Sequence, residues 1–355
     1  MAAAAGSGTI PTGPGPGPSG LSGLLADATR RLEAAGVASP RADAEQLAAF
    51  VLGVGRARLL LVDAMPAPAA ERFAALVRRR AAREPLQHLT GVVGFRYLDL
   101  AVGPGVFVPR PETESVVGWA IDALRRAPAG PGGRAAARAD GPTCVDLCSG
   151  SGAIALALAT EVPGARVHAV EVDPAALRWL RRNVAATLDG PPVGSALGRH
   201  GGSAAGPPGG SAGEACAGYA GGSVEVHEAD VTGQPPPSLA RLAGVVDLVV
   251  SNPPYLPDAD RNAVEPEVGE HDPARALWGG ADGLDVVRAV VALAARLLRP
   301  GGLLVVEHAD GHGGTAPALL RADGRWVDVA DHTDLAGRDR FVTGRLAGPL
   351  DRKDG

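Results

Sequence analysis

From Thr143 onward, short apolar runs of strand length alternate with segments of helical periodicity, and this alternation constrains the fold more than any other feature of the sequence. Strands that are separated by helices pair in parallel, with the helices on both faces of the sheet. The sequence therefore predicts a doubly wound, mostly parallel α/β sheet whose last two strands, with no ordinary helix between them, form an antiparallel pair. The predicted strands are 143–147, 166–171, 224–227, 245–251, 303–307, 326–330 and 341–345, and the predicted helices are 153–160, 174–188 and 284–298.

The rest of the chain differs in composition from this alternating region. The first residues alternate Gly and Pro, a composition that buries too little apolar surface to offset chain entropy. Apolar residues at helical spacing follow, and then a Gly-punctuated stretch rich in β-branched residues. The predicted organisation is a disordered extension at 1–20, a helical domain at 21–90, a β-hairpin linker at 91–111, a main domain at 112–346 with a flexible low-complexity insertion at 189–222, and a tail at 347–355.

Charge and residue usage narrow the class of function. The formal net charge of -5 and the pI near 5.9 argue against a protein that grips nucleic acid through a broad basic surface. Lys353, in the tail, is the single lysine, so a Schiff-base or P-loop lysine has no candidate. The three cysteines lack zinc-site spacing, and the sequence shows neither a signal peptide nor a long apolar run. We expect a cytoplasmic protein without membrane contact or stable nucleic-acid binding.

A glycine-rich turn joins the first predicted strand of the main domain to its first helix. This turn, Cys148-Ser149-Gly150-Ser151-Gly152, consists of small residues that let the backbone approach a ligand closely. It does not keep the G-x-G-x-x-G frame of a dinucleotide site, since Cys148 stands where that frame has glycine. By itself the turn is equally consistent with a cofactor site and with a tight turn that binds nothing.

Two acidic positions at strand ends strengthen the interpretation as a nucleoside site. Glu171 ends the second predicted strand about 20 residues after the turn, where a carboxylate can accept hydrogen bonds from both hydroxyls of a ribose. Asp230 and Val231 follow the third strand, where Asp230 can accept from an adenine amino group and Val231 can pack on the ring. An exposed strand-end acid and a loop-capping Asp are the respective alternatives.

Asn252-Pro253-Pro254-Tyr255 follows the predicted buried strand 245–251 and forms a stiff polar edge at its carboxyl end. The Asn252 side-chain oxygen and the Pro253 carbonyl can accept both hydrogens of an NH2 group, while Tyr255 packs against the planar group. Two such acceptors favour a pyramidal nitrogen, and therefore stabilise the transition state of attack more than the ground state. The tetrapeptide predicts chemistry on a planar amine, with a proline-stiffened turn as the structural alternative.

These motifs resemble the PrmC/HemK family of peptide chain release factor N5-glutamine methyltransferases. Asn-Pro-Pro-Tyr alone is shared with enzymes that methylate adenine N6, so the segments before it carry the specificity of the resemblance. The similarity covers about 21–346 apart from the insertion. The matching segments are 83–91, 107–114, 146–158, 249–255, 298–302 and 306–308.

The resemblance implies a class I S-adenosylmethionine-dependent methyltransferase fold, Rossmann-like with an antiparallel last strand, behind a small N-terminal helical domain that recognises the substrate. It implies methylation of the glutamine in the Gly-Gly-Gln motif of class I release factors by a monomer without a metal. The alternatives are a glutamine methyltransferase of a ribosomal protein, an adenine-N6 nucleic-acid methyltransferase and a non-catalytic binding protein. The implied cofactor contacts are Cys148, Ser149, Gly150, Ser151, Gly152, Glu171, Asp230, Val231 and Asn252; the implied substrate contacts are Asn252, Pro253, Pro254 and Tyr255, with Asn252, Pro253 and Tyr255 catalytic, and 109–111 at the site entrance.

Some positions depart from the family pattern or fall outside it. Cys148 replaces the usual first glycine of the turn, which predicts a turn whose backbone tolerates a side chain without a positive φ. The eight histidines are scattered along the sequence, so we expect no ligand cluster, and we expect His88 and His308 to be hydrogen-bonded structural groups. The run 78–80 of three arginines predicts a solvated face, with contact to the release factor or ribosomal RNA as the alternative.

Overall fold

The computed structural model describes residues 20–126, 141–189, 221–348 and 351. The predicted extension at 1–20, insertion at 189–222 and tail at 347–355 lie almost wholly outside these ranges. Within the described chain, contacts divide after Leu86 into two compact units. We describe each unit by itself.

The first unit is a small helical bundle, as the apolar spacing predicts. Its helices are amphipathic, and Leu25, Leu47 and Phe73 from three of them are buried in a common apolar core. Gly53 ends the second helix in the left-handed conformation (φ 66°), where the absence of a Cβ removes the steric cost. The elements are α1 (Leu21–Ala34), α2 (Pro40–Leu52), the 3-10 helix η1 (Arg56–Leu61) and α3 (Ala67–Ala81), and α4 (Leu86–Thr90) begins at the division between the units.

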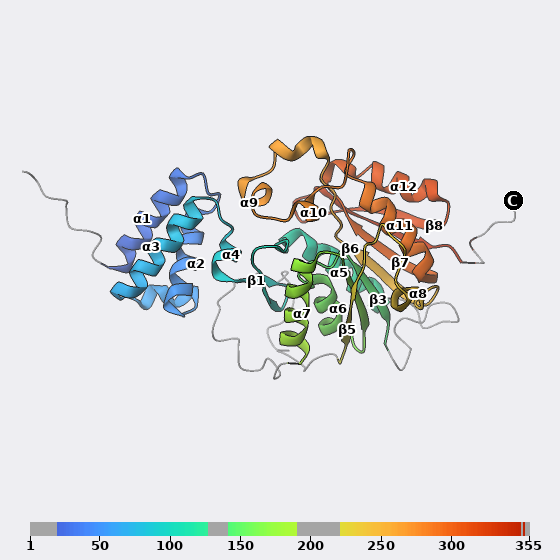
Figure 1. Cartoon of the computed structure of the whole chain (residues 1–355), viewed down its shortest axis with the longest axis horizontal. Coiled ribbons are helices and arrows are strands. Elements are labelled where there is room, and N and C mark those ends of the chain that lie inside the picture. The colour runs from blue at the N-terminus through green and yellow to red at the C-terminus, as the bar shows by residue number, and fades with distance from the viewer. Residues whose placement is uncertain (1–19, 127–140, 190–220, 349–350, 352–355) are drawn as a thin grey trace, which may run out of the picture. The chain divides into compact units, whose positions relative to one another are not determined.

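A seven-stranded sheet organises the second unit (Figure 1). The strand order is β5-β4-β3-β6-β7-β9-β8, and every pair from β5 to β7 is parallel. β9 pairs antiparallel with both β7 and β8, which confirms the predicted antiparallel pair. The strands are β3 (Thr143–Leu147), β4 (Arg166–Glu171), β5 (Ser223–Glu228), β6 (Val246–Ser251), β7 (Leu298–Glu307), β8 (Trp326–Thr333) and β9 (Asp339–Leu346).

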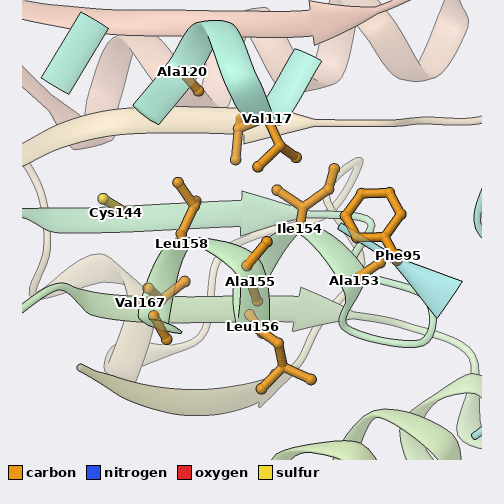
Figure 2. Close-up of a cluster of buried hydrophobic side chains, with 14 of the residues drawn as sticks. Phe95, Val117, Ala120, Cys144, Ala153, Ile154, Ala155, Leu156, Leu158 and Val167 are labelled. Carbon is orange, nitrogen blue, oxygen red and sulfur yellow. The ribbon is translucent and has the colours of Figure 1, made fainter. Parts of the chain in front are cut away.

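Helices cover both faces of this sheet, so the fold is doubly wound, and its strand order with an antiparallel end agrees with the fold that the resemblance implies. One apolar cluster joins α5, α6 and α7 to one face, and Figure 2 shows side chains of α5 and α6 gathered with Cys144 and Val167 of the strands. A second cluster joins α8, α11 and α12 to the opposite face. The helices are α5 (Pro111–Arg126), α6 (Ala153–Glu161), α7 (Pro174–Leu188), α8 (Pro237–Ala240), α11 (Asp285–Leu297) and α12 (Thr315–Asp323).

The predicted hairpin is present as β1 (Val92–Phe95) and β2 (Leu98–Ala101), which pair antiparallel. Arg96, in its turn, has a φ of 53° and forms a bidentate ion pair with Glu161 at the end of α6, with N···O distances of 2.6 and 2.7 Å. The Asn183 side chain of α7 exchanges hydrogen bonds with the backbone of Ala101 at 2.8 and 3.0 Å. The hairpin is thereby fixed to the helices that flank the sheet.

The structure also contains elements that were not predicted from the sequence. Strand β7 begins at Leu298, which pairs with Val246, rather than at the predicted 303. The register then shifts, with Gly301 at a φ of 78°, and the regular ladder with β6 resumes at Leu303. Helix α12 was not predicted, since Gly314 and Pro317 interrupt its apolar spacing. No helix in the described ranges combines the length and apolarity that crossing a bilayer requires. Short elements also lie between β6 and α11: η2 (Asp258–Asn262), α9 (Pro266–Gly269) and α10 (Ala274–Leu277), with η3 (Asp310–His312) after β7.

Candidate active site

A cavity of about 470 Å³ lies in the second unit, at the carboxyl ends of β3, β4, β5 and β6. The strand order reverses between β3 and β6, and open α/β sheets bind ligands in the crevice at such a switch point. The structure brings most of the predicted site residues together here. Gly152 and Pro253 are absent from the lining, and the predicted residues that line the cavity are Cys148, Ser149, Gly150, Ser151, Glu171, Asp230, Val231, Asn252, Pro254 and Tyr255.

The glycine-rich turn after β3 adopts left-handed backbone conformations at three positions. Cys148 has a φ of 63°, so the prediction that this turn tolerates a side chain without a positive φ is wrong. Gly150 (φ 54°) has no other atom within 4 Å of where a Cβ would stand, which leaves room on this side of the turn. Gly152 (φ 89°) is the N-cap of α6, and a Cβ there would lie 2.6 Å from Cδ1 of Leu180, so a larger residue would require this buried leucine to shift.

Backbone hydrogen bonds hold the turn against the sheet. The Ser149 amide donates to the Val170 carbonyl of β4 at 3.0 Å, and the Ser149 hydroxyl donates to the Asp146 carbonyl at 2.9 Å. Asn183 of α7 donates to the Ser151 carbonyl at 2.9 Å, so the same side chain braces both the turn and the hairpin. Asp146 accepts from the Ala155 amide in the first turn of α6 at 3.1 Å, and burial raises the pKa of this carboxyl to about 8.

Glu171, at the end of β4, is buried and lies beside this turn. Its Oε2 accepts from the Gly150 amide at 2.8 Å, and its Oε1 accepts from the amides of Val172 and Asp173, both at 2.8 Å. These three bonds fix the carboxylate at the cavity wall. A carboxylate oxygen has two lone pairs, so Oε2, which accepts a single backbone bond, keeps acceptor capacity for a ligand hydroxyl, whereas the two amides occupy Oε1.

Asp230 both caps its own loop and lines the cavity. Its Oδ1 accepts from the Thr232 amide at 2.9 Å and from the Thr232 hydroxyl at 2.6 Å. These hydrogen bonds lower the pKa of Asp230, so the group stays ionised. Asp230 is therefore a loop-capping residue, and its Oδ2 takes no part in the capping bonds. Val231 lies next to it in the cavity wall.

Asn252 follows β6, and a hydrogen bond from α5 sets the orientation of its amide. Its Nδ2 donates to Oγ1 of Thr113 at 3.1 Å. Thr113 is buried in the first turn of α5 and also lines the cavity. Because Nδ2 is engaged by Thr113, the oxygen of the Asn252 amide is the end left for a ligand.

Tyr255 and Glu307 form a second polar contact behind the Asn-Pro-Pro-Tyr edge. The Tyr255 hydroxyl donates to Oε1 of Glu307, at the end of β7, at 3.1 Å. Glu307 is almost wholly buried, and this burial raises its pKa to about 7 although hydrogen bonds from Thr113 and Tyr255 lower it. Burial and the Glu307 charge also raise the pKa of Tyr255, so the phenol is a neutral donor at physiological pH.

Arg110 lies at the cavity wall, as predicted for the entrance segment 109–111. Its Nη2 donates to Oδ2 of Asp272 at 2.6 Å, and its guanidinium lies 5.0 Å from the ring centroid of Phe107. Burial raises the pKa of Asp272 to about 6 although Arg110 lowers it. Pro109 also lines the cavity, whereas Pro111, the first residue of α5, does not.

Sequence reasoning missed the side chains that support the site from other elements. Thr113, Asn183 and Glu307 lie 139, 69 and 55 positions from Asn252 in the chain, and only the fold brings them together. Thr113 and Glu307 stand within segments that carry the family resemblance, but nothing in their local pattern indicates a bond to Asn252 or Tyr255. Asn183 is the one of the three whose supporting role the sequence could have indicated, because it is a polar residue on the apolar face of α7.

Other predicted residues have roles away from the cavity. His308 is buried and bonds to Asp331 at 2.7 Å and to the Ala309 carbonyl at 2.8 Å, which confirms a structural histidine. The arginine run 78–80 is only partly a solvated face: Arg80 is buried against Asp43 at 2.7 Å, whereas Arg79 pairs with Glu84 at the surface.

Comparison with known proteins gives extensive matches. A family model described as the PrmC N-terminal domain matches residues 23–91. The chain is 48% identical to a release factor glutamine methyltransferase of Streptomyces coelicolor over 325 residues, which cover 92% of this chain and 98% of the relative. It is 46% identical to the protein of the same name from Mycolicibacterium smegmatis, covering 89% and 94% of the two chains, and 43% identical to that of Mycobacterium tuberculosis, covering 90% and 89%.

Proposed function

The chain belongs to the release factor glutamine methyltransferase family, and from this premise we propose that it methylates the glutamine of the Gly-Gly-Gln motif of class I peptide chain release factors. It is an S-adenosylmethionine-dependent protein-(glutamine-N5) methyltransferase. The observation that supports methylation of a glutamine amide is the orientation of the Asn252 side chain. Its Nδ2 donates to Thr113, which leaves its oxygen as the acceptor for a ligand in the cavity. An acceptor there suits the NH2 group of a substrate amide.

The cavity fits S-adenosylmethionine in size and in the chemistry of its lining. Its volume lies within the range of small-molecule sites, and the turn 148–152 leaves room beside Gly150. In the proposed arrangement Glu171 accepts from the ribose hydroxyls, Asp230 from the adenine amino group, and Val231 packs on the ring. The bound cofactor supplies an electrophilic methyl group on a sulfonium. Cys148, Ser149, Gly150, Ser151 and Gly152 form the turn around it, with Asn252 at its reacting end.

The residues after β6 would bind and orient the substrate amide. Asn252 Oδ1 and the Pro253 carbonyl accept the two N–H groups, which directs the nitrogen lone pair away from these acceptors. Pro254 and Tyr255 pack beside the planar group, and Pro253, buried and rigid, contributes through its carbonyl rather than its side chain. An amide nitrogen is a weak nucleophile because its lone pair is delocalised. Acceptors that favour a pyramidal nitrogen lower the barrier to its attack.

The helical domain at 21–90 would recognise the release factor, with 91–111 as the linker to the methyltransferase domain at 112–346. The match of 23–91 to the PrmC N-terminal domain supports this assignment. This unit also presents two adjacent leucines to solvent, Leu60 at 92% and Leu61 at 84% exposure. We place the enzyme in the cytoplasm with the translation machinery, as a monomer that forms no stable complex with nucleic acid.

A methyl-transfer assay with purified components tests the proposal. The protein is incubated with isotopically labelled S-adenosylmethionine and either a class I release factor or its variant with alanine for the motif glutamine. Mass spectrometry then locates the methyl group. We expect label on the glutamine amide nitrogen and none on the variant. Label on a ribosomal protein or on DNA adenine, with none on the release factor, would overturn it.

Asn252→Ala tests the proposed amide clamp in the same assay. Loss of one preorganised group that stabilises a transition state typically lowers kcat by about 10²–10³-fold. We expect a decrease of this size with cofactor affinity, measured by calorimetry, within a few fold of the wild type. Asn262→Ala, at an exposed position of η2, is the matched control and should retain full activity. Full activity of Asn252→Ala would remove Asn252 from the catalytic set.

A further inference from the structure

Two histidines and a glutamate converge on one spot of the sheet, away from the cavity. His168 of β4 and His227 of β5 are both buried, and Nδ1 of His168 lies 3.0 Å from Nε2 of His227. Glu225 lies 3.5 Å from His168 Nδ1 through Oε2 and 3.8 Å from His227 Nε2 through Oε1. One donor atom from each of the three side chains lies within 4.8 Å of the other two. The expectation that the histidines form no cluster is not met, because residues 59 positions apart meet across two strands.

The pairing of β4 with β5 explains why the three side chains meet. His168 is the register partner of Glu225 in this parallel pair. Glu225 and His227 are two residues apart in β5, so their side chains project from the same face. Ser238 of α8 lies over this face and bonds to Nδ1 of His227 at 3.1 Å. The cluster is thus formed by two strands and one helix, none of which contributes a mobile loop.

The separations of the donor atoms match those around a small divalent ion. In a tetrahedral site with metal–ligand bonds of about 2.0–2.1 Å, neighbouring donor atoms lie about 3.3 Å apart. The two ring nitrogens lie 3.0 Å apart, and each lies 3.5 or 3.8 Å from a different oxygen of Glu225, so a rotation of this half-exposed carboxylate is needed to bring one oxygen close to both rings. Two imidazole nitrogens and one carboxylate oxygen, with the fourth position for water, form a donor set that suits zinc.

The surroundings of the histidines also favour ligation. The bond between His227 Nδ1 and Ser238 fixes the ring so that Nε2 faces His168, and metal-bound histidines usually have such an oxygen partner on their second nitrogen. The competing group is Arg241, which pairs with Glu225 at 2.6 and 2.9 Å. Its side chain is 57% exposed and can turn into solvent.

We propose that His168, Glu225 and His227 form a binding site for a divalent ion of the zinc class. The ion would join β4 to the edge strand β5. Its ligands His168 and His227 lie three residues before Glu171, which ends β4, and Asp230, which follows the end of β5, and both of these carboxylates line the cavity. Such a link would fix the relative position of the two carboxylates. It is independent of the methyl-transfer proposal, because none of the three side chains lines the cavity and ion binding can be measured without substrate.

Zinc titration of the full chain, first freed of metal with a chelator, tests the site. We expect one Zn²⁺ bound per chain at this site and a rise in the melting temperature on binding. Cobalt in place of zinc should give the intense visible absorption of a tetrahedral Co²⁺ complex. Because Glu225 is half exposed, Glu225→Gln should fold normally while weakening zinc affinity by at least about tenfold. Glu228→Gln, at an exposed position of the same strand, is the control and should leave binding unchanged.

Two further variants distinguish a metal site from a histidine pair that serves only packing. Arg241→Ala removes the competitor for Glu225 and should tighten zinc binding, whereas a packing role gives no reason for any change. Ser238→Ala should weaken binding about tenfold through the lost support of His227. Absence of zinc binding in the wild type would overturn the proposal. So would zinc affinity and cobalt absorption that are the same in Glu225→Gln as in the wild type.

Discussion

At the scale of single residues, the direction in which one amide points determines what the cavity can bind. The two ends of the Asn252 side chain differ only in being donor or acceptor, and the bond from Nδ2 to Thr113 assigns them. With the opposite orientation, the cavity would present a donor and would repel the N–H groups of a substrate amide. Thr113 therefore acts as a positioning residue for the proposed clamp, although it need not touch the reacting atoms.

Thr113→Val tests this positioning role because valine keeps the shape of threonine and removes its hydroxyl. A single hydrogen bond contributes about 0.5–1.5 kcal/mol, which corresponds to a decrease in kcat of up to about tenfold. We expect this decrease in the labelled-methyl assay, with cofactor affinity unchanged. Thr113→Ser restores the hydroxyl and should restore kcat. If the serine variant is as slow as the valine variant, the hydroxyl is not what orients Asn252.

Glu307 gives the protein a pH dependence of stability whose sign follows from its raised pKa. Its pKa is about 7 in the fold and near 4.5 unfolded, so the protonated form is favoured by folding. The stabilisation is fully present below about pH 4.5 and is lost as the pH rises through 7. We expect this carboxyl to lower the free energy of unfolding by on the order of 3 kcal/mol between pH 4.5 and pH 8.

Urea unfolding of Glu307→Gln at both pH values measures this contribution, since the amide cannot ionise. The variant should lose less stability than the wild type over the interval. Glu270→Gln, at an exposed position, is the control and should follow the wild type. Parallel curves for Glu307→Gln and the wild type would show that Glu307 is already ionised at low pH.

At the scale of elements, the sequence identified the strands, the flanking helices α6, α7 and α11, and the order of the motifs at the strand ends, but not α12. These features are local, because each depends on a periodicity of two or 3.6 residues and on glycines at fixed positions. The conformation of the turn after β3 was not recoverable in the same way. A cysteine is expected to avoid a positive φ, but Cys148 has a φ of 63° in a turn whose next residue, Ser149, is hydrogen-bonded to Val170 of β4. The hydrogen bonds of Asn252 to Thr113 and of Glu171 to Gly150 could not be predicted from the sequence either.

Gly152→Ala tests how tightly the turn and α6 are packed. Alanine at this position would be strained by the φ of 89°. Its methyl group would also lie 2.6 Å from the side chain of Leu180, which is fully buried. The left-handed conformation costs about 1–2 kcal/mol and overpacking typically a further 1–3 kcal/mol. We expect the free energy of unfolding to fall by the sum of these and cofactor affinity to fall with it.

Gly244→Ala provides the matched comparison, because Gly244 has a φ of 71° but no atom within 4 Å of where its Cβ would stand. It should show only the conformational part of the cost, and cofactor affinity should be unaffected. Equal destabilisation in the two variants would mean that the helix shifts to accommodate the methyl group.

At the scale of the whole molecule, the chain consists of a helical unit and a catalytic unit. The proposed division of labour assigns substrate recognition to the first. Replacing Leu60 and Leu61 together by serine should raise KM for the release factor at least about tenfold, since a buried leucine contributes roughly 1.5–3 kcal/mol. Cofactor affinity should not change. Leu335→Ser, at a fully exposed leucine of the catalytic unit, is the control.

Steady-state kinetics with varied release factor would show the effect as a change in KM without a change in kcat. An unchanged KM would place the recognition surface elsewhere on the molecule. A fall in kcat with unchanged KM would instead implicate these leucines in the conformation of the enzyme.

The pairing of β3 with β6 has a consequence for how such an enzyme can be modified. Leu147 and Ser251 are register partners, so the turn 148–152 and the Asn252 edge begin side by side on neighbouring strands. The distance between their first residues is therefore set by the interstrand spacing of about 4.8 Å and does not depend on the length of any loop. A designer who wishes to offer this enzyme another amide can rebuild the entrance and the helical unit freely. The span across which the methyl group travels would stay the same.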